Sequence, residues 1–275
     1  ATKIPYRDPE TQIVNYTNCT AIENGWIWEI PLWSRMGAGY VYSNRFISHD
    51  EALLEFQQTL TKKGYKNVED LKYHLIPMRC GIQSKLWVKN TCAIGLAASF
   101  IEPLQSNGLH SIHTFLYNLC SILTRGYISE WDRKEFTVKC HNDFYTIAAT
   151  VAFSYTLSHR DDTEYWREIQ NRDWTPDPFS PYLGGISSPF SEAYFEKNIQ
   201  RRFSDGKPIL HCMAAGMNWN PIDKHYLKYS RRDIEDFKKF IEFNIQRIEE
   251  RKKRWNEQVK DFPSPYQYLK DNIHN

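Results

Sequence analysis

The chain has 275 residues, of which 41% are hydrophobic and 15% aromatic, and its formal net charge is +2 at pH 7. This length can bury one large core or two modest ones, and the near balance of charge argues against nucleic acid as a partner. The apolar runs are too short to cross a membrane and the opening residues have no targeting character, so we expect no membrane association.

Cysteine and aromatic usage narrow the class of protein further. Six cysteines, at positions 19, 80, 92, 120, 140 and 212, show neither a C-x-x-C motif nor paired spacing. This usage favours a reduced, intracellular protein over a disulfide scaffold or a metal site, and we expect a cytoplasmic location. The 9 Trp, 17 Tyr and 15 Phe suit a site for flat ligands or, equally, an aromatic core.

The first part of the chain has the alternation typical of β-strands. We predict strands over 13–22, 25–33 and 40–43, separated by turns at 23–25 and 36–39. Trp26, Trp28 and Ile30 alternate within the second strand and therefore share one sheet face. Two indoles on one face can form the floor of a pocket for a flat ring, or can belong to the core of the sheet.

Helical periodicity dominates the rest of the chain. Ser48 and Glu51 form a capping box before a helix that stops at Gly64, and extended segments are predicted over 71–79 and 82–88. Apolar spacing then predicts helices over 109–123, 131–157, 164–170, about 193–202 and from about residue 231, the last with Ile245 and Ile248 on its inward face. Residues 174–192 indicate a long loop of the kind that forms binding lids. Strands first and helices later favour an α+β fold.

The segment 87–108 ends in the sequence Ser106-Asn107-Gly108, directly before the helix predicted from Leu109. Backbone N–H groups at a helix start point toward one place, and the helix dipole makes that place mildly positive. An anion site and an ordinary capped helix start both fit this pattern.

Four blocks, in order along the chain, resemble the flavin-dependent tryptophan halogenase family. G-W-I-W-E-I-P-L at 25–32 is similar to its W-x-W-x-I-P signature, and R-M-G-A-G-Y-V-Y-S at 35–43 follows in the family's order. W-V-K-N-T-C-A-I-G-L-A-A-S-F-I-E-P-L-Q-S-N-G at 87–108 resembles its W-x-x-N-C-x-A-I-G-L-x-x-x-F-x-E-P-L-E-S-T-G block. F-S-Y-T-L-S-H-R-D-D-T-E-Y-W-R at 153–167 resembles its H-Y-x-x-x-x-R-x-D-T-x-F-W-R block. The similarity covers residues 1–170 well and the remainder weakly.

The resemblance implies an α/β family fold: a flavin-binding module of the hydroxybenzoate-hydroxylase type joined to a mostly helical substrate module. In this chain it assigns 1–108 to the C-terminal part of the FAD and halide module, and 109–275 to the substrate-binding module. It also implies FAD, delivered as FADH2 by a separate flavin reductase, together with oxygen and chloride, bromide or iodide. The expected reaction is halogenation of a small electron-rich aromatic, such as an indole or a phenol.

The resemblance also assigns roles at the flavin end of the site. Trp26 and Trp28 match the tryptophan pair that walls the passage between flavin and substrate, and Leu109 falls where the family packs an aliphatic residue on the isoalloxazine ring. Asn107 and Gly108 match the Thr-Gly pair whose backbone N–H groups hold the halide. Exchanging Thr for Asn leaves such a backbone site intact.

At the substrate end the sequence departs from the family. Gln105 occupies the position of the catalytic glutamate, and a neutral amide cannot accept a proton from the reacting ring. Glu102 is another carboxylate that could serve, although in the family its counterpart looks structural. Ser154 replaces a histidine that helps to frame an indole, and Tyr155 follows it as a second substrate residue. These departures predict a substrate other than free tryptophan.

Two family features have no counterpart in the sequence: the G-x-G-x-x-G fingerprint for FAD and the lysine that directs the electrophile. Both precede the matching region in the family, so we expect the complete protein to be longer. A flavin monooxygenase that does not use halide and a non-catalytic binding protein on a decayed halogenase fold are the alternatives. The sequence leaves the oligomeric state open, and a homo-oligomer is one possibility.

Overall fold

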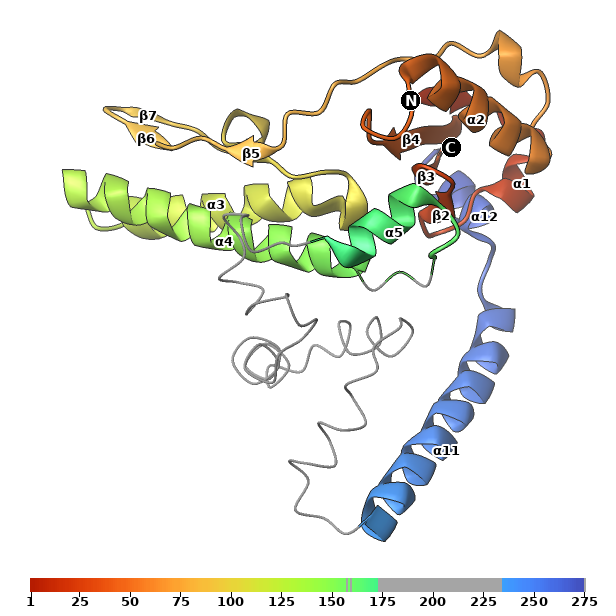
Figure 1. Ribbon diagram of the computed structural model, residues 1–275. Coiled ribbons are helices and arrows are strands. Elements are labelled where there is room, and N and C mark those ends of the chain that lie inside the picture. The colour runs from red at the N-terminus through yellow and green to blue at the C-terminus, as the bar shows by residue number, and fades with distance from the viewer. Residues whose placement is uncertain (157, 159, 173–233, 275) are drawn as a thin grey trace. The chain divides into compact units, whose positions relative to one another are not determined.

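The computed structural model describes residues 1–156, 158, 160–172 and 234–274. They belong to two compact units (Figure 1). The first contains 1–76, 160–167 and the described residues of 221–275, and the second contains the described residues of 77–159 and 168–220. The loop predicted at 174–192 and the helix predicted at about 193–202 lie outside the described residues. A functional division after residue 108 stays a prediction.

The first unit is built on a four-stranded antiparallel sheet with strand order β1-β4-β3-β2. Its strands are β1 (Thr2–Ile4), β2 (Asn18–Ile22), β3 (Gly25–Leu32) and β4 (Arg35–Tyr42). The turn predicted at 36–39 is wrong, because these residues lie inside β4 and pair with β3. Two glycines in that stretch resemble a turn signal, but Trp28 pairs directly with Gly39, and Gly39 makes room for its indole.

One face of this sheet packs against α2 (His49–Lys62), which begins with the predicted capping box of Ser48 and Glu51. Side chains alternate between the faces of a strand, so Ile27 lies on the core face while Trp26 and Trp28 lie on the opposite one. The buried members of this first core are Ile4, Ile22, Ile27, Met36, Ala38, Phe56, Leu60 and Val68.

The core face also carries a buried carboxylate, Glu29. Its two oxygens are satisfied by an ion pair with Lys63 and by a hydrogen bond that the Tyr65 hydroxyl donates over 2.9 Å. Lys63 donates a second bond, of 2.8 Å, to the hydroxyl of Thr20. A buried charge is tolerated only when it is paired and hydrogen-bonded, and this cluster meets that condition.

Several shorter segments also belong to the first unit. Thr163 and Trp166, at the start of α5 (Glu164–Asn171), donate hydrogen bonds of 2.8 Å to the carbonyls of Glu23 and Ile22. The short helices α1 (Pro9–Gln12) and α12 (Pro265–Asn272) also belong here. Trp33, in the β3–β4 turn, stacks on Tyr266 and His274 with ring centroids 5.4 and 4.4 Å away.

The long helix α11 (Ile234–Gln258) confirms the predicted last helix. The prediction that Ile245 and Ile248 face inward is wrong, since they are 54% and 52% exposed. Apolar spacing defines a stripe on a helix but not whether another element covers it. Within the described residues, no helix combines the length and apolarity that crossing a bilayer requires.

The second unit pairs two helices with short strands. β5 (Gly81–Ile82) pairs with β8 (Ser99–Phe100), and β6 (Trp87–Val88) pairs with β7 (Thr91–Cys92). The extended segment predicted at 82–88 contributes the end of β5 and the whole of β6, and 71–79, all of it described, forms no strand. The helices α3 (Asn107–Leu123) and α4 (Glu130–Thr156) confirm two predicted helices. Their shared core contains Leu86, Trp87, Ala98, Phe115, Ile122, Phe136, Cys140 and Phe144.

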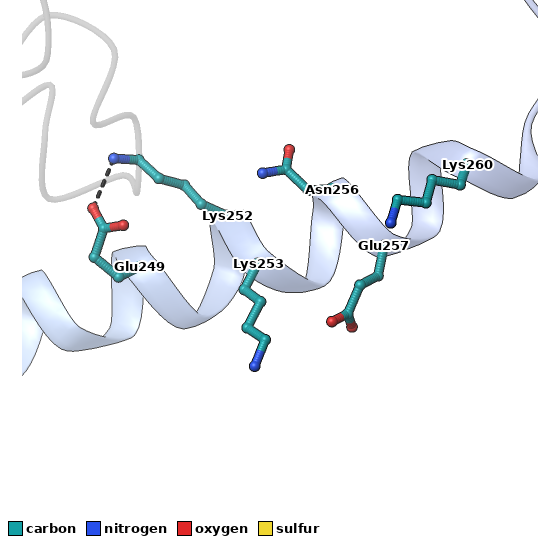
Figure 2. A pocket seen from close by; sticks show the side chains of 6 residues that line it. All are labelled: Glu249, Lys252, Lys253, Asn256, Glu257 and Lys260. Carbon is teal, nitrogen blue, oxygen red and sulfur yellow. Dashed lines mark hydrogen bonds and ion pairs between the residues drawn. The ribbon is translucent and has the colours of Figure 1, made fainter.

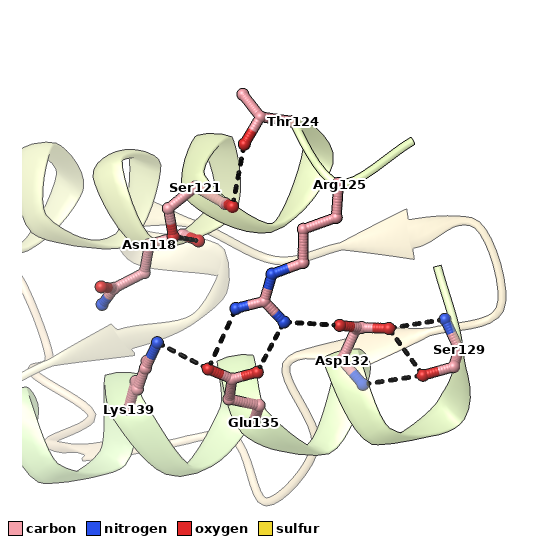
Figure 3. A network of polar contacts seen from close by, with 8 residues as sticks. All are labelled: Asn118, Ser121, Thr124, Arg125, Ser129, Asp132, Glu135 and Lys139. Atoms are coloured by element: carbon pink, nitrogen blue, oxygen red, sulfur yellow. Dashed lines mark hydrogen bonds and ion pairs between the residues drawn. The ribbon is translucent and has the colours of Figure 1, made fainter. Parts of the chain in front are cut away.

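A charged network joins the end of α3 to the start of α4 (Figure 3). The Arg125 guanidinium donates hydrogen bonds to Asp132 over 2.8 Å and to Glu135 over 2.9 Å, and Glu135 also pairs with Lys139. Ser129 and Asp132 exchange hydrogen bonds that cap α4. The connection between the two helices is thereby fixed at both of its ends.

Taken together, the mixture of helix and sheet in the two units confirms the α+β class.

Candidate functional site

The candidate site is built on the segment that leads into α3. A single turn of 3-10 helix, η3 (Leu104–Ser106), precedes Asn107, the first residue of α3. Ser106 adopts a left-handed conformation, with φ 51° and ψ 36°, and its side chain makes no capping bond to the helix. The N–H groups of a first helical turn have no partner within the helix, and the helix dipole gives them a positive character. The turn at 104–107 therefore presents donors suited to an anion.

Asn107 is buried, and its side chain fixes this turn. Its Nδ2 donates to the carbonyl oxygens of Glu102 and Leu104, at 2.9 Å each. The Asn107 carbonyl in turn accepts a 3.0 Å hydrogen bond from the Ser111 hydroxyl. An asparagine amide has two N–H donors, so one side chain can bind both carbonyls.

Glu102 connects the same turn to α4. Its Oε1 accepts the backbone N–H of Leu104 over 3.0 Å, and its Oε2 accepts the Tyr155 hydroxyl over 2.5 Å. Burial raises the pKa of the Glu102 carboxyl, and the two hydrogen bonds oppose that rise. Both carboxyl oxygens are thus engaged within the fold.

The predicted residues of this unit occupy distinct settings. Gln105 lies in η3, between Leu104 and Ser106. Gly108 is exposed, and Leu109 is 69% exposed at the surface of the first helical turn. Ser154 is buried on α4, and Tyr155, next to it, is half-buried. Asn107 and Tyr155 both bind Glu102: Asn107 donates to its main-chain carbonyl and Tyr155 to its side-chain carboxyl.

Trp26 and Trp28 belong to the first unit. Trp26 is buried and Trp28 is half-buried. A Cβ added to Gly39 would lie 2.4 Å from Trp28 Cε2 and Cζ2, so the indole lies directly on the bare backbone of β4. Gly39 of the R-M-G-A-G-Y block therefore leaves the space that the tryptophan of the preceding strand occupies.

Sequence reasoning missed the bond between Tyr155 and Glu102. The Glu-Pro step and the Ser-Tyr pair each stand out within a family motif, but 53 residues separate them. Helical periodicity places Tyr155 on α4 without saying which loop it meets. Contacts between distant segments have no local signature, so only the folded unit reveals this pair.

Two open hollows in the described part of the chain lie along α11, away from this turn in the sequence. Figure 2 shows one of them, where side chains of both charges extend from a single helix and Lys252 pairs with Glu249 over 2.8 Å. One helix cannot enclose a ligand, and its mixed charges do not converge on one point. These hollows are surface relief of a solvated helix.

Comparison with known proteins agrees with the motifs. The sequence model of the tryptophan halogenase family matches residues 1–181. Tryptophan 7-halogenase RebH of Lentzea aerocolonigenes is 28% identical over 230 residues, which are 80% of this chain and 43% of RebH.

Solved structures show the same relationship. The apo structure of VirX1 is 29% identical with a TM-score of 0.73, over 99% of this chain and 52% of VirX1. The crystal structure of tryptophan 6-halogenase SttH from Streptomyces toxytricini is 31% identical with a TM-score of 0.58, over 66% of this chain and 36% of SttH. The chain spans about half the length of these relatives, or less. With the ordered motifs and the matching fold, these similarities establish that the chain belongs to the tryptophan halogenase family.

Proposed function

We propose that the protein containing this chain is a FADH2-dependent halogenase that acts on an electron-rich aromatic other than free tryptophan. The observation that carries the proposal is the turn at 104–107. Asn107 takes the position of the family's halide-binding threonine, and its buried side chain fixes the backbone whose N–H groups would bind the anion. Such a site needs backbone donors rather than a particular side chain.

The residues around this turn have separate roles in the proposal. The N–H groups of Asn107 and Gly108 bind chloride, bromide or iodide at the positive end of α3. Leu109, which is 69% exposed, offers an apolar surface to the flat isoalloxazine ring. When bound, FADH2 delivered by a separate flavin reductase would, together with oxygen, supply the oxidant that converts halide to an electrophile. Trp26 and Trp28 wall the path to the substrate and keep it away from the flavin.

The modular division follows from these roles. Residues 1–108 contribute to the flavin and halide module of the hydroxybenzoate-hydroxylase type, and 109–275 form the substrate module.

Two residues argue that the substrate differs from free tryptophan. Gln105 cannot remove a proton from the ring as a glutamate would, so the substrate must release its proton to another group or to water. Ser154 is smaller than the histidine expected there and is buried in α4. Glu102 is a weak replacement base, because Leu104 and Tyr155 bind both its oxygens.

Product analysis tests the proposal directly. Full-length protein is incubated with a flavin reductase, NADH, FAD, bromide or iodide, and a panel of indoles and phenols, with heat-killed protein as the control. We expect halogenated products from members of the panel other than tryptophan. Absence of product above the control contradicts the proposal. An oxygenated product that does not require halide would indicate a monooxygenase, and absence of flavin binding would indicate a binding protein.

Restoring the family's residue provides a sharper test. The Gln105→Glu variant should gain activity on substrates that need a base, by roughly 10²-fold if general-base catalysis is regained in full. An unchanged rate on the best substrate would mean that this reaction requires no carboxylate at position 105.

A further inference from the structure

We propose that Tyr155 is a positioning residue whose hydroxyl holds Glu102 and thereby sets the turn that carries Gln105 and the anion-binding N–H groups. This inference rests on the proposed function for its effect on catalysis. Its structural part, that Tyr155 orders residues 104–108, stands independently of which reaction the protein performs.

The first step is the contact with Glu102. The Tyr155 hydroxyl reaches Oε2 over 2.5 Å, while Oε1 of the same carboxyl accepts the Leu104 N–H over 3.0 Å. A hydrogen bond to a carboxylate is shorter and stronger than one between neutral groups. Glu102 therefore bridges the last part of α4 and the start of η3.

The second step is the closure of the turn by Asn107. Its amide binds the carbonyls of Glu102 and Leu104, so Glu102, Leu104 and Asn107 form a closed set of hydrogen bonds. Ser106 lies inside this set in a left-handed conformation with φ 51°. A residue other than glycine keeps such a conformation only where its surroundings impose it, and here the closed set of bonds imposes it.

The third step is the rigidity of α4, the helix that carries Tyr155. The helix α4 packs on α3 through side chains that are fully or almost fully buried, among them Phe115 and Ile122 of α3 and Phe136 and Phe144 of α4. Close-packed interiors move little and transmit strain. A tyrosine on α4 can therefore fix a turn against the same body to which α3 belongs.

The consequence for the reaction is specific. Without the Tyr155 hydroxyl, Oε2 of Glu102 loses its donor and the turn at 104–107 gains freedom. Halide binding depends on the direction of two backbone N–H groups, so the affinity for halide should fall before the affinity for the aromatic substrate does. A role of Tyr155 in direct contact with the aromatic substrate would instead weaken binding of that substrate.

The experiment compares Tyr155→Phe with Tyr145→Phe, a half-buried tyrosine of the same helix that packs on the same core. In full-length protein, we expect Tyr155→Phe to raise the KM for bromide by roughly tenfold, the size of one lost bond to a charged group. The KM for the aromatic substrate should change less than about twofold on the same scale. An unchanged bromide KM, or a rise confined to the aromatic KM, overturns the proposal.

Amide hydrogen exchange gives a readout that does not depend on activity. We expect Tyr155→Phe to speed exchange in peptides covering 102–110, and to leave peptides from the middle of α3 unchanged, which also verifies folding. Equal exchange in wild type and variant overturns the positioning role. If wild-type protein yields no halogenated product while the exchange effect is present, the proposed function fails and the positioning role stands.

A double-mutant cycle with Glu102→Gln tests whether the effect passes through Glu102. If Tyr155 acts through this carboxyl, the double variant should exchange no faster at 102–110 than the faster of the two single variants. Additive effects would mean that Tyr155 orders the turn by another route and would overturn the proposed path.

Discussion

Replacing Gly39 by alanine tests how closely Trp28 lies on the sheet. The added Cβ would come within 2.4 Å of Trp28 Cε2 and Cζ2, and within 2.7 Å of Nε1. Carbon atoms in contact prefer about 3.5–4.0 Å, so the rigid indole must move by about 1 Å. Overpacking of this kind costs about 1–3 kcal/mol, and we expect Gly39→Ala to lower the free energy of unfolding by that amount.

Gly37 provides the matched control, because it lies two residues earlier on the same face of the same strand. An alanine Cβ there would be 3.6 Å from Trp28 Cζ3 and from the Ile30 carbonyl oxygen, which is ordinary contact. Alanine lowers the conformational entropy of the unfolded chain relative to glycine, so Gly37→Ala should be neutral or stabilising by up to about 1 kcal/mol. The two variants should therefore differ by about 1–4 kcal/mol.

The assay is urea unfolding followed by far-UV circular dichroism, which reports on backbone structure and is not dominated by the other tryptophans. With a slope of about 1–3 kcal/mol per molar urea, the difference should separate the two midpoints by roughly 1 M. Adding Trp28→Leu to Gly39→Ala should recover part of the loss. Equal midpoints for the two alanine variants would refute the close packing of Trp28 on Gly39.

Two further outcomes follow from titrating groups in the second unit. Arg125 and Lys139 lower the pKa of Glu135 from its usual 4.5 to about 2; the stabilisation this provides is present above about pH 4.5 and is lost as the pH falls toward 2. Glu135→Gln should therefore weaken the acid dependence of unfolding between these pH values, and an unchanged acid-unfolding curve would contradict the pairing. Burial raises the pKa of Cys140 to about 12, so at pH 8 iodoacetamide should label exposed Cys120 well before Cys140, as peptide mass spectrometry can check. Equal labelling rates in folded protein would show that Cys140 is accessible.

The sequence predicts elements well where local chemistry decides them. The capping box of Ser48 and Glu51 and the helices α3 and α4 lie where apolar spacing and capping place them. Local chemistry misleads over 36–39, because glycine favours turns while at Gly39 the indole of the neighbouring strand requires bare backbone. The exposed Ile245 and Ile248 show the same limit, since a periodic stripe does not reveal its partner.

The candidate site divides in the same way. The sequence places Asn107 and Gly108 beside a helix start because such a start has a local pattern, and their role in binding an anion stays a prediction. The hydrogen bonds of the Asn107 side chain could not be predicted from the sequence, because they depend on where the carbonyls of Glu102 and Leu104 point after folding. The bond from Tyr155 to Glu102 joins two motifs that the sequence treats separately.

The first unit is assembled from pieces that are far apart in the chain, and this has a consequence for biosynthesis. The sheet leaves the ribosome early, yet the donors to the Ile22 and Glu23 carbonyls come from Trp166 and Thr163, more than 130 residues later. Long-range closure of this kind slows folding. In the nascent chain, the carbonyls of the β2–β3 turn therefore lack these two donors until synthesis has passed residue 166. A chain truncated between the sheet and α5 would leave the carbonyls of that turn without these donors.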